Sequence, residues 1–189
     1  MPRASMREQL VDAAHDHFHE HGFNGSGIKE ITDAAGVPKG SFYNHFDSKE
    51  SMAVEVMRRY GESRRLEMLA DESVTPVERI RNHFAYLAED LGRYDYTRGC
   101  MFGNFGAELS TQSGTIRAEV SDSFAAWESA LAAALGQAQA AGQLASTVDS
   151  AVLAGFLVNA WEGAAMRAKV VGDSSPLDHF FTVFDSMTA

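Results

Sequence analysis

The chain has 189 residues, of which 45% are hydrophobic, and a formal net charge of -10 at pH 7. These values are typical of a soluble globular protein with room for one small and one larger domain. No apolar run approaches the roughly 20 residues that span a bilayer, and the N-terminus lacks the core of a signal peptide. We therefore expect a cytoplasmic protein with no membrane partner. The single cysteine, Cys100, excludes an intrachain disulfide and a four-cysteine zinc site.

The acidic charge is unevenly distributed along the chain. Residues 1–60 contain seven Lys and Arg against nine Asp and Glu, a balance of -2, whereas residues 61–189 contain nine against seventeen, a balance of -8. The total charge therefore does not exclude a nucleic-acid partner of the first 60 residues. We expect few phosphate contacts and modest non-specific affinity, because both depend on Lys and Arg.

The first predicted helix begins after Ser5 and ends at Gly22. Ser5 and Glu8 have the spacing of a capping box. The apolar face of this helix consists of Leu10, Ala14 and Phe18. Its histidines form two pairs at four-residue spacing, His15 with His19 and His17 with His21. Either pair suits two positions of a metal site, but no third ligand is evident beyond Asp16 or Glu20, so a solvated face is the preferred interpretation and no metal is predicted.

Residues 26–46 predict two short helices joined by a tight turn. The apolar face of the first helix consists of Ile28, Ile31 and Ala35. Gly36 supplies a left-handed stop, Pro38 begins the second helix, and Phe42 and Phe46 pack this helix against the first. The outward positions of the second helix are Lys39, Gly40, Ser41, Tyr43 and Asn44. Such a pair is a helix-turn-helix, in which short polar side chains of the second helix reach base edges in the major groove.

Three helices are predicted in the middle of the chain. Asp47 and Glu50 indicate a capping box that opens a helix from about Lys49 to Leu69. Thr75 and Glu78 open the next, with proline at its first position, and it runs to about Arg93. The third follows a candidate cap at Thr97 and ends near residues 113–114; its apolar residues are Met101, Phe105 and Leu109.

The last three predicted helices are strongly apolar. One stripe runs over five turns and ends at Gly142; it consists of Ile116, Val120, Phe124, Trp127, Leu131 and Leu135. A helix opened by Ser146 and Asp149 and stopped by Gly172 carries Val152, Phe156, Asn159, Gly163 and Met166. The final helix begins at residues 175–178 and carries Phe180, Phe181 and Phe184. Nine helices and almost no strand signal predict an all-α fold.

Residues 36–46 and 48–50, with Gly22-Phe23 and residues 28–31 before them, closely resemble the DNA-binding signature of the TetR family of bacterial repressors. The match covers about the first 60 residues. The resemblance implies a nine-helix TetR-like fold, with a three-helix helix-turn-helix domain over residues 1–48 and an effector-binding and dimerisation domain over residues 49–189. Residues 98–105, with Ala168-Lys169 downstream, resemble the NemR-like and AcuR-like branch, whose members act in small-electrophile metabolism.

The resemblance implies two sets of DNA contacts. The base contacts are Lys39, Gly40, Ser41 and Asn44, and the phosphate contacts are Ser26, Tyr43, His45 and Lys49. The chemistry agrees for two of them, since Lys39 can donate to guanine and Asn44 can pair bidentately with adenine. Pro38 departs from the Ser or Thr that often caps this helix, so a side-chain acceptor is missing there.

The larger domain is expected to hold an effector pocket. Two stripes mix polar and apolar groups on apolar helices: Asn159, Glu162, Met166 and Lys169, and Cys100, Asn104 and Glu108. The aromatic lining is predicted from Tyr60, Phe105 and Trp127. Polar groups on an inward face cost free energy unless they are paired or used, so the stripes are candidate pocket walls. The alternative is that Glu162 and Lys169 are solvated and the aromatic residues belong to the core.

Cys100 is a candidate sensing thiol. A helix N-terminus and the neighbouring Arg98 both favour the thiolate. The alternatives are a small buried side chain with no reactivity, or a residue beside a non-covalently bound unsaturated acid or carbonyl compound.

The last two helices have a second apolar face, which is expected to be covered by a second copy of the chain. The predicted interface consists of Leu153, Leu157, Ala160, Ala164, Leu177, Phe180, Phe181 and Phe184. The family resemblance implies the same four-helix homodimer interface. Two-fold symmetry places the reading helices roughly one DNA turn or slightly more apart.

The sequence contains no GxSxG, P-loop, HExxH or dinucleotide motif, so neither an enzyme nor a cofactor is predicted. The predicted function is a repressor that binds a palindromic operator as a dimer and is released by a small organic effector or electrophile. The first alternative is a helical small-molecule-binding protein whose helix-turn-helix serves another partner. The second is a helical enzyme.

Overall fold

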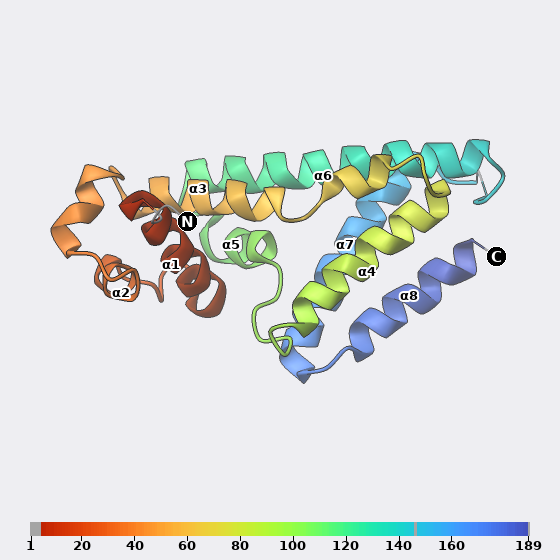
Figure 1. The fold of residues 1–189 in the computed structure, drawn as a ribbon. Helices are drawn as coiled ribbons and strands as arrows, with labels where there is room; N and C mark the ends of the chain where they lie inside the picture. The colour runs from red at the N-terminus through yellow and green to blue at the C-terminus, as the bar shows by residue number, and fades with distance from the viewer. Residues whose placement is uncertain (1–4, 146, 189) are drawn as a thin grey trace. The chain divides into compact units, whose positions relative to one another are not determined.

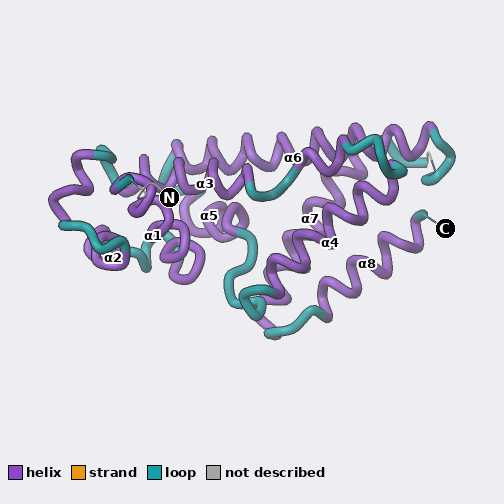
Figure 2. Tube along the Cα trace, viewed as in Figure 1, coloured by secondary structure: helices purple, strands orange, loops and turns teal. Residues whose placement is uncertain are grey.

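The computed structural model describes residues 5–145 and 147–188. In these residues every regular element is a helix, eight of them α-helices and two short 3-10 helices (Figure 1). Figure 2 shows the same trace as helices joined by loops, without a strand in the described part. The predicted all-α class is confirmed. Each of the nine predicted helices has a counterpart, and the tenth element arises because one predicted helix is divided in two.

The chain forms two compact units. The N-terminal unit consists of Met1–Ser63 and Met101–Ser121, and the C-terminal unit consists of Arg64–Cys100 and Asp122–Ala189. The chain therefore passes between the units three times, once at the peptide bond between Cys100 and Met101. The predicted domain boundary after residue 48 separates DNA binding from effector binding and dimerisation, and it stays a prediction.

The N-terminal unit is built from four helices of the first 63 residues and two later ones. Its elements are α1 (Met6–His21), α2 (Ile28–Ala34), η1 (Lys39–Asn44), α3 (Lys49–Glu62), α5 (Met101–Leu109) and the first part of α6 (Gly114–Ala140). The predicted capping box is present, since the Ser5 hydroxyl accepts the Glu8 N–H at 3.2 Å and the Glu8 carboxylate accepts the Ser5 N–H at 2.7 Å. The fully buried core includes Leu10, Phe18, Ile31, Phe42, Met52, Val56 and Phe105.

Two predicted features of α3 are wrong. Its capping box is made by Ser48 and Ser51, not by Asp47 and Glu50, because the extended backbone of Ser48 brings its hydroxyl within 3.0 Å of the Ser51 N–H. The helix also ends at Glu62 and does not continue to Leu69. Arg65 has a left-handed backbone (φ 55°), which an α-helix cannot contain, and the short helix η2 (Leu66–Ala70) follows it.

The C-terminal unit contains η2, α4 (Pro76–Gly92), the rest of α6, α7 (Ser150–Val171) and α8 (Ser175–Met187). The predicted box at Thr75 and Glu78 caps α4, with Pro76 at its first position. The core of this unit is strongly aromatic. The Phe180 ring lies 4.6 Å from the Phe84 ring and 5.2 Å from the Trp161 ring, between centroids.

The predicted start of the fifth α-helix is also corrected. The Thr97 hydroxyl donates to the Tyr94 carbonyl at 2.7 Å and so does not cap a helix. Helix α5 begins at Met101, and Cys100 therefore precedes the helix, outside its first turn. Of the predicted cap of α7, Ser146 lies outside the described residues, and the Asp149 carboxylate accepts the Ala151 and Val152 N–H groups at 2.9 and 3.2 Å.

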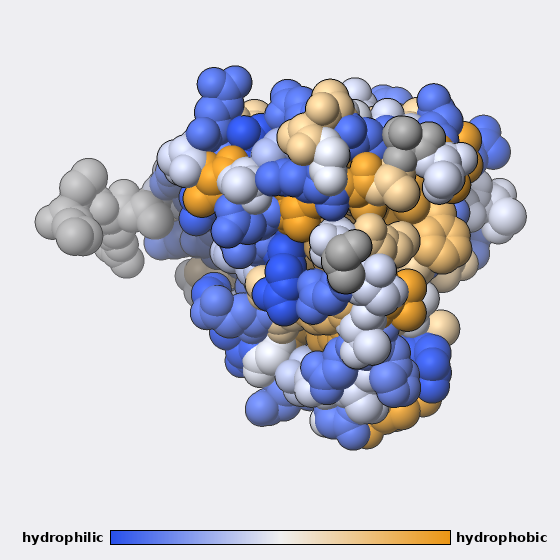
Figure 3. Space-filling view, turned by 90° about the vertical axis from the view of Figure 1, so that its right-hand side faces the viewer, coloured by the Kyte–Doolittle hydropathy of each residue, from blue (hydrophilic) through white to orange (hydrophobic). Residues whose placement is uncertain are grey.

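The surface is mixed in polarity. Figure 3 shows hydrophobic residues that reach the surface among hydrophilic ones on the face it presents. Four large apolar side chains of α7 are more than half exposed: Val152, Phe156, Met166 and Val170. Among the helices of residues 5–145 and 147–188, none has the length and apolar character that a membrane crossing requires.

Candidate functional site

The outward face of η1 presents the predicted base-reading residues to solvent. Lys39, Gly40 and Asn44 are exposed, and Ser41 is half-buried. The element is held from its other side by Phe42, which is fully buried. It is a 3-10 helix and not an α-helix, and Pro38 before it offers no side-chain acceptor, as the sequence implied. The arrangement is that of a short element anchored by aromatic residues with polar side chains directed outward.

The predicted phosphate contacts separate into two groups. Tyr43 is 61% exposed and His45 is half-buried, so both reach the surface near η1. Ser26 is fully buried, and its hydroxyl donates to the Gly22 carbonyl at 2.7 Å. The side chain of Ser26 is therefore occupied inside the unit, and its phosphate contact stays a prediction.

Lys49 also has an internal role that the sequence did not indicate. Its ammonium donates to the carbonyl oxygens of Phe23 and Ser26 at 2.8 and 3.0 Å and lies 4.1 Å from the centroid of the Phe23 ring. Burial lowers the pKa of Lys49, and the charge of Glu108 opposes that shift. In this structure Lys49 holds the turn between α1 and α2, and its phosphate contact stays a prediction.

The structure divides the predicted effector residues between the two units. The N-terminal unit contains Tyr60, Asn104, Phe105 and Glu108, and the C-terminal unit contains Cys100, Trp127, Asn159, Glu162, Met166 and Lys169. Phe105 is fully buried and packs against the rings of Phe18 and Phe23. This agrees with the alternative in which the predicted aromatic lining belongs to the core. The Glu108 carboxylate accepts the N–H groups of Phe23 and Asn24. It therefore binds a turn of the N-terminal unit.

Tyr60 is a buried residue of α3 that contacts two other helices, α1 and α5. Its hydroxyl accepts the Met101 N–H at 3.3 Å, and its ring lies 5.1 Å from the Phe102 ring. The rings of His15 and His19 lie 6.2 and 5.4 Å from it. His19 is only 4% exposed, so the predicted solvated face is wrong for this residue, which packs against Tyr60. The described residues contain no group of three or more metal-binding side chains.

Cys100 and Glu162 are half-buried and form a pair in the C-terminal unit. The Cys100 thiol and the Glu162 carboxyl share a hydrogen bond, and burial raises the pKa of Glu162 to about 7. The Oε1 atom of Glu162 is buried without a hydrogen-bond partner among the described residues. Lys169 donates to the Arg98 carbonyl at 3.3 Å, and the Arg98 guanidinium lies 3.8 Å from the Tyr94 ring centroid. The alternative in which both Glu162 and Lys169 are solvated is therefore wrong for Glu162, whereas Lys169 is exposed as it predicted.

Two other members of the α7 stripe do not face inward. Asn159 and Met166 are exposed in the single chain, so they form no wall of an internal pocket. Trp127 is buried, and its ring lies 5.8 Å from the ring of His83. His83 was missed by the sequence reasoning. It is fully buried, and burial, reinforced by the charge of Arg64, lowers its pKa to about 4. Its only sequence signal is a position one residue before the core residue Phe84.

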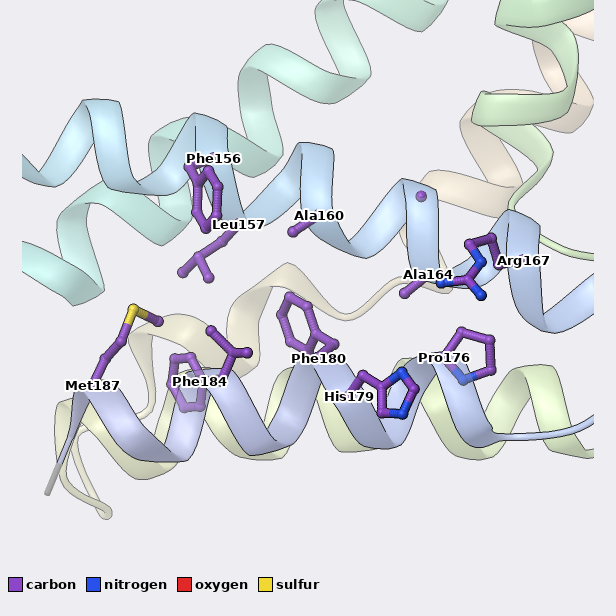
Figure 4. A pocket seen from close by; sticks show the side chains of 12 residues that line it. Phe156, Leu157, Ala160, Ala164, Arg167, Pro176, His179, Phe180, Phe184 and Met187 are labelled. Carbon is purple, nitrogen blue, oxygen red and sulfur yellow. The ribbon is translucent and has the colours of Figure 1, made fainter.

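A cavity of about 320 Å³ lies between α7 and α8. Figure 4 shows Phe156, Leu157, Ala160, Ala164 and Arg167 on α7 opposite Pro176, His179, Phe180, Phe184 and Met187 on α8.

The predicted interface residues of α7 and α8 are largely covered by their own chain. Leu157, Leu177 and Phe184 are at most 2% exposed, and Ala164 and Phe180 are also buried. Leu153, Ala160 and Phe181 are half-buried. The exposed apolar residues are instead those of the neighbouring stripe on α7, with Val183 on α8.

The comparisons with known proteins agree with this arrangement. Residues 10–56 match the family described as "Bacterial regulatory proteins, tetR family", and residues 76–184 match the "Tetracyclin repressor-like, C-terminal domain". The chain is 38% identical to the HTH-type transcriptional repressor DhaR of Mycobacterium sp. (strain GP1), over 97% of this chain and 92% of that protein. It is 34% identical to the transcriptional regulator AcuR of Cereibacter sphaeroides, over 97% and 85%.

Solved structures of similar proteins have the same fold. A regulatory protein TetR from Rhodobacter sphaeroides superposes with a TM-score of 0.92 at 31% identity, over 98% of this chain and 100% of that one. The reduced form of E. coli NemR superposes with a TM-score of 0.84 at 26% identity, over 97% of each chain.

Proposed function

Because the chain belongs to the TetR family of bacterial transcriptional regulators, and to its NemR-like and AcuR-like branch, we propose that it represses transcription by binding a palindromic operator as a homodimer. A small organic effector releases it. The observation that carries this proposal is the outward face of η1, where Lys39 and Asn44 are exposed on an element that Phe42 anchors. Lysine and asparagine are side chains that read guanine and adenine in the major groove.

The dimer is supported by the exposed stripe on α7. Its members are Val152, Phe156, Asn159, Gly163, Met166 and Val170. Large apolar side chains in a contiguous exposed stripe indicate a surface that a partner covers. A second copy of the same stripe, related by a two-fold axis, covers it and duplicates the η1 surface for the two halves of a palindrome.

The proposed function is tested by selecting bound duplexes from a random pool with the full-length protein. We expect a palindromic sequence to be enriched and its Kd to rise with salt concentration, since phosphate contacts release counterions. Absence of any sequence preference at low ionic strength contradicts the proposal. Binding of small molecules without duplex selection supports the alternative, a helical binding protein whose helix-turn-helix serves another partner.

The release step is proposed to begin at Cys100. The thiol adds to the β-carbon of an α,β-unsaturated carbonyl compound: the S–H bond breaks, an S–C bond forms, and the proton ends on the α-carbon as the carbon–carbon π bond is lost. Glu162 shares a hydrogen bond with this thiol and has a pKa of about 7, so its carboxylate is placed to accept the thiol proton near neutral pH.

The thiol step predicts a specific loss in a Cys100→Ser variant. N-ethylmaleimide is expected to release the parent protein from its operator and to leave the variant bound, because serine is not nucleophilic enough to add to the reagent. Fluorescence anisotropy of a labelled operator measures the release. The parent without reagent is the control. Equal release of parent and variant rules out Cys100 as the sensor.

A further inference from the structure

The turn between α1 and α2, residues 22–26, is bound through its amide groups by a side chain from far along the sequence. The N–H of Phe23 donates to Oε2 of Glu108 at 2.9 Å, and the N–H of Asn24 donates to Oε1 at 2.6 Å. Successive N–H groups of a turn form a concave nest for an anion, and Gly22, with φ 71° and ψ 179°, directly precedes these two N–H groups. A Cβ on Gly22 would lie 2.7 Å from Glu108 Oε2, so glycine is needed for this close approach.

The carbonyl groups of the same turn are bound from α3. Lys49 holds the carbonyl oxygens of Phe23 and Ser26, and the Ser26 hydroxyl holds that of Gly22. The turn is therefore clamped between a carboxylate on α5 and an ammonium on α3. Helix α2 begins at Ile28, directly after this turn, and packs against both α1 and η1.

Helix α5 is also fixed at its other end within the N-terminal unit. Its first N–H, from Met101, donates to the Tyr60 hydroxyl of α3. In its middle, the Phe105 ring lies 5.7 Å from the Phe18 ring of α1. Bound at its start, middle and end, α5 is part of the unit that carries η1. The residue before it, Cys100, belongs to the C-terminal unit, so one peptide bond joins the proposed thiol sensor to this helix.

We propose that Glu108 is the positioning residue through which α5 carries a change at Cys100 to the turn that supports α2 and η1. The inference rests on the proposed function and deepens it, because it names the route from the thiol to the DNA-reading surface. A displacement at the start of α5 moves the Glu108 carboxylate away from the two N–H groups. The turn then loses the hydrogen bonds that fix the start of α2, and η1 no longer keeps its operator-bound placement.

The experiment is a two-by-two comparison on the full-length dimer. Cys100 is the only cysteine of the chain, so N-ethylmaleimide modifies this site alone, as mass spectrometry verifies. Operator Kd is measured for the parent and for Glu108→Gln, each with and without the adduct. A glutamine side chain replaces one of the two acceptor oxygens by a donor NH2, so in the observed arrangement it accepts only one of the two N–H groups. The matched control is Glu119→Gln, whose carboxylate pairs with Arg58 in the same unit.

Alkylation is expected to raise the operator Kd of the parent and of Glu119→Gln by about 5- to 150-fold. In Glu108→Gln the factor by which the same adduct raises the operator Kd is expected to be smaller by roughly 2- to 30-fold. In the parent, hydrogen exchange at the Phe23 and Asn24 amides is expected to quicken after alkylation. Equal alkylation factors in the parent and Glu108→Gln overturn the proposal, because a residue that only stabilises the fold weakens both species alike.

The other outcomes separate this proposal from the proposed function. If the unmodified parent selects no duplex, the proposed function fails. If the parent binds its operator and the adduct leaves Kd unchanged, the operator-binding function stands, and both the thiol step and the Glu108 route are overturned. Should Glu108→Gln not fold, Glu108→Asp replaces it, since it keeps the charge and is one methylene too short to reach both N–H groups. Should Cys100 resist alkylation, Cys100→Phe supplies the added bulk at that position, with the same expectations.

Discussion

Two titratable side chains in the C-terminal unit, the fully buried His83 and the half-buried Glu162, have pKa values shifted in opposite directions. The pKa of Glu162 is raised from 4.5 to about 7, and that of His83 is lowered from 6.5 to about 4, in both cases mainly by burial. Between pH 4.5 and 7 the folded chain keeps a proton on Glu162 that the unfolded chain has lost, so stability falls as pH rises. Between pH 6.5 and 4 the unfolded chain binds a proton on His83 that the folded chain excludes, so stability falls as pH decreases.

Replacement of the buried acid tests the first of these effects. Relative to the parent, Glu162→Gln is predicted to gain up to about 3 kcal/mol in free energy of unfolding between pH 4.5 and pH 8, because the amide has no charge to desolvate. Urea unfolding at several pH values measures this difference. The control is Glu72→Gln at an exposed position, which should leave the difference constant with pH. Parallel curves for parent and Glu162→Gln contradict the prediction.

His83→Phe is predicted to show the opposite dependence of the free energy of unfolding on pH. Its free energy of unfolding relative to the parent should rise by up to about 3 kcal/mol as pH falls from 7 to 4, since phenylalanine does not bind the proton that favours the unfolded chain. The same unfolding series measures it, with the exposed His21→Gln as control. A difference that does not change with pH would show that His83 is protonated as readily in the folded chain as in the unfolded one.

At the scale of single elements, η1 combines a buried aromatic anchor with an exposed polar face. We predict that Lys39→Ala lowers operator affinity by about 1–3 kcal/mol and relaxes preference at one base pair. The control is Lys29→Ala on α2, which removes an exposed ion pair with Asp33. Anisotropy titrations on the operator and on single-base variants measure both quantities. A loss of similar size on every sequence, with a salt slope lower by about 1, would assign Lys39 to a phosphate instead.

The N-termini of the helices show which local sequence signals are sufficient to predict an N-cap. The boxes at Ser5 and Thr75 were predicted correctly, because each cap has one suitable acceptor and a glutamate three residues later. At α3, Asp47 and Ser48 are adjacent and both residue types are favourable N-caps. Only the backbone conformation determines that Ser48 is the N-cap. At α5, Thr97 was a plausible cap by residue type, but its hydroxyl serves the preceding turn.

At the scale of the whole molecule, the exposed stripe of α7 has the spacing of a helix-packing seam. From Val152 to Val170 its members alternate at intervals of four and three residues. This alternation keeps one stripe facing a partner helix over several turns. In the described chain no segment of its own covers Val152, Phe156, Met166 and Val170, which remain more than half exposed.

The seam predicts that Phe156→Asp produces a monomer. An aspartate at 56% exposure costs a single chain little, whereas a charge in a dimer interface must be desolvated. Analytical ultracentrifugation measures the association state, and affinity for the palindromic operator should fall with it. The control is Val148→Asp, an exposed apolar position outside α7. A Phe156→Asp variant that remains a dimer would remove this face from the interface.

The sequence by itself determined the helical class, the order of the helices and the DNA-reading motif. These features depend on residues within one or two turns of one another, such as Phe42 and Phe46 on one side of η1 and Lys39 and Asn44 on the other. Local spacing also showed that α7 has two apolar faces. It did not show which face its own chain covers, because that depends on where α8 packs.

Only the tertiary structure decided the contacts between distant residues. The hydrogen bonds of Glu108 join positions 84 and 85 residues apart, and no spacing rule relates them. The same holds for the hydrogen bond between Cys100 and Glu162 and for the burial that shifts the pKa of His83. Helical periodicity determines which side of a helix is apolar, whereas the burial and partner of a polar group depend on the helices packed around it.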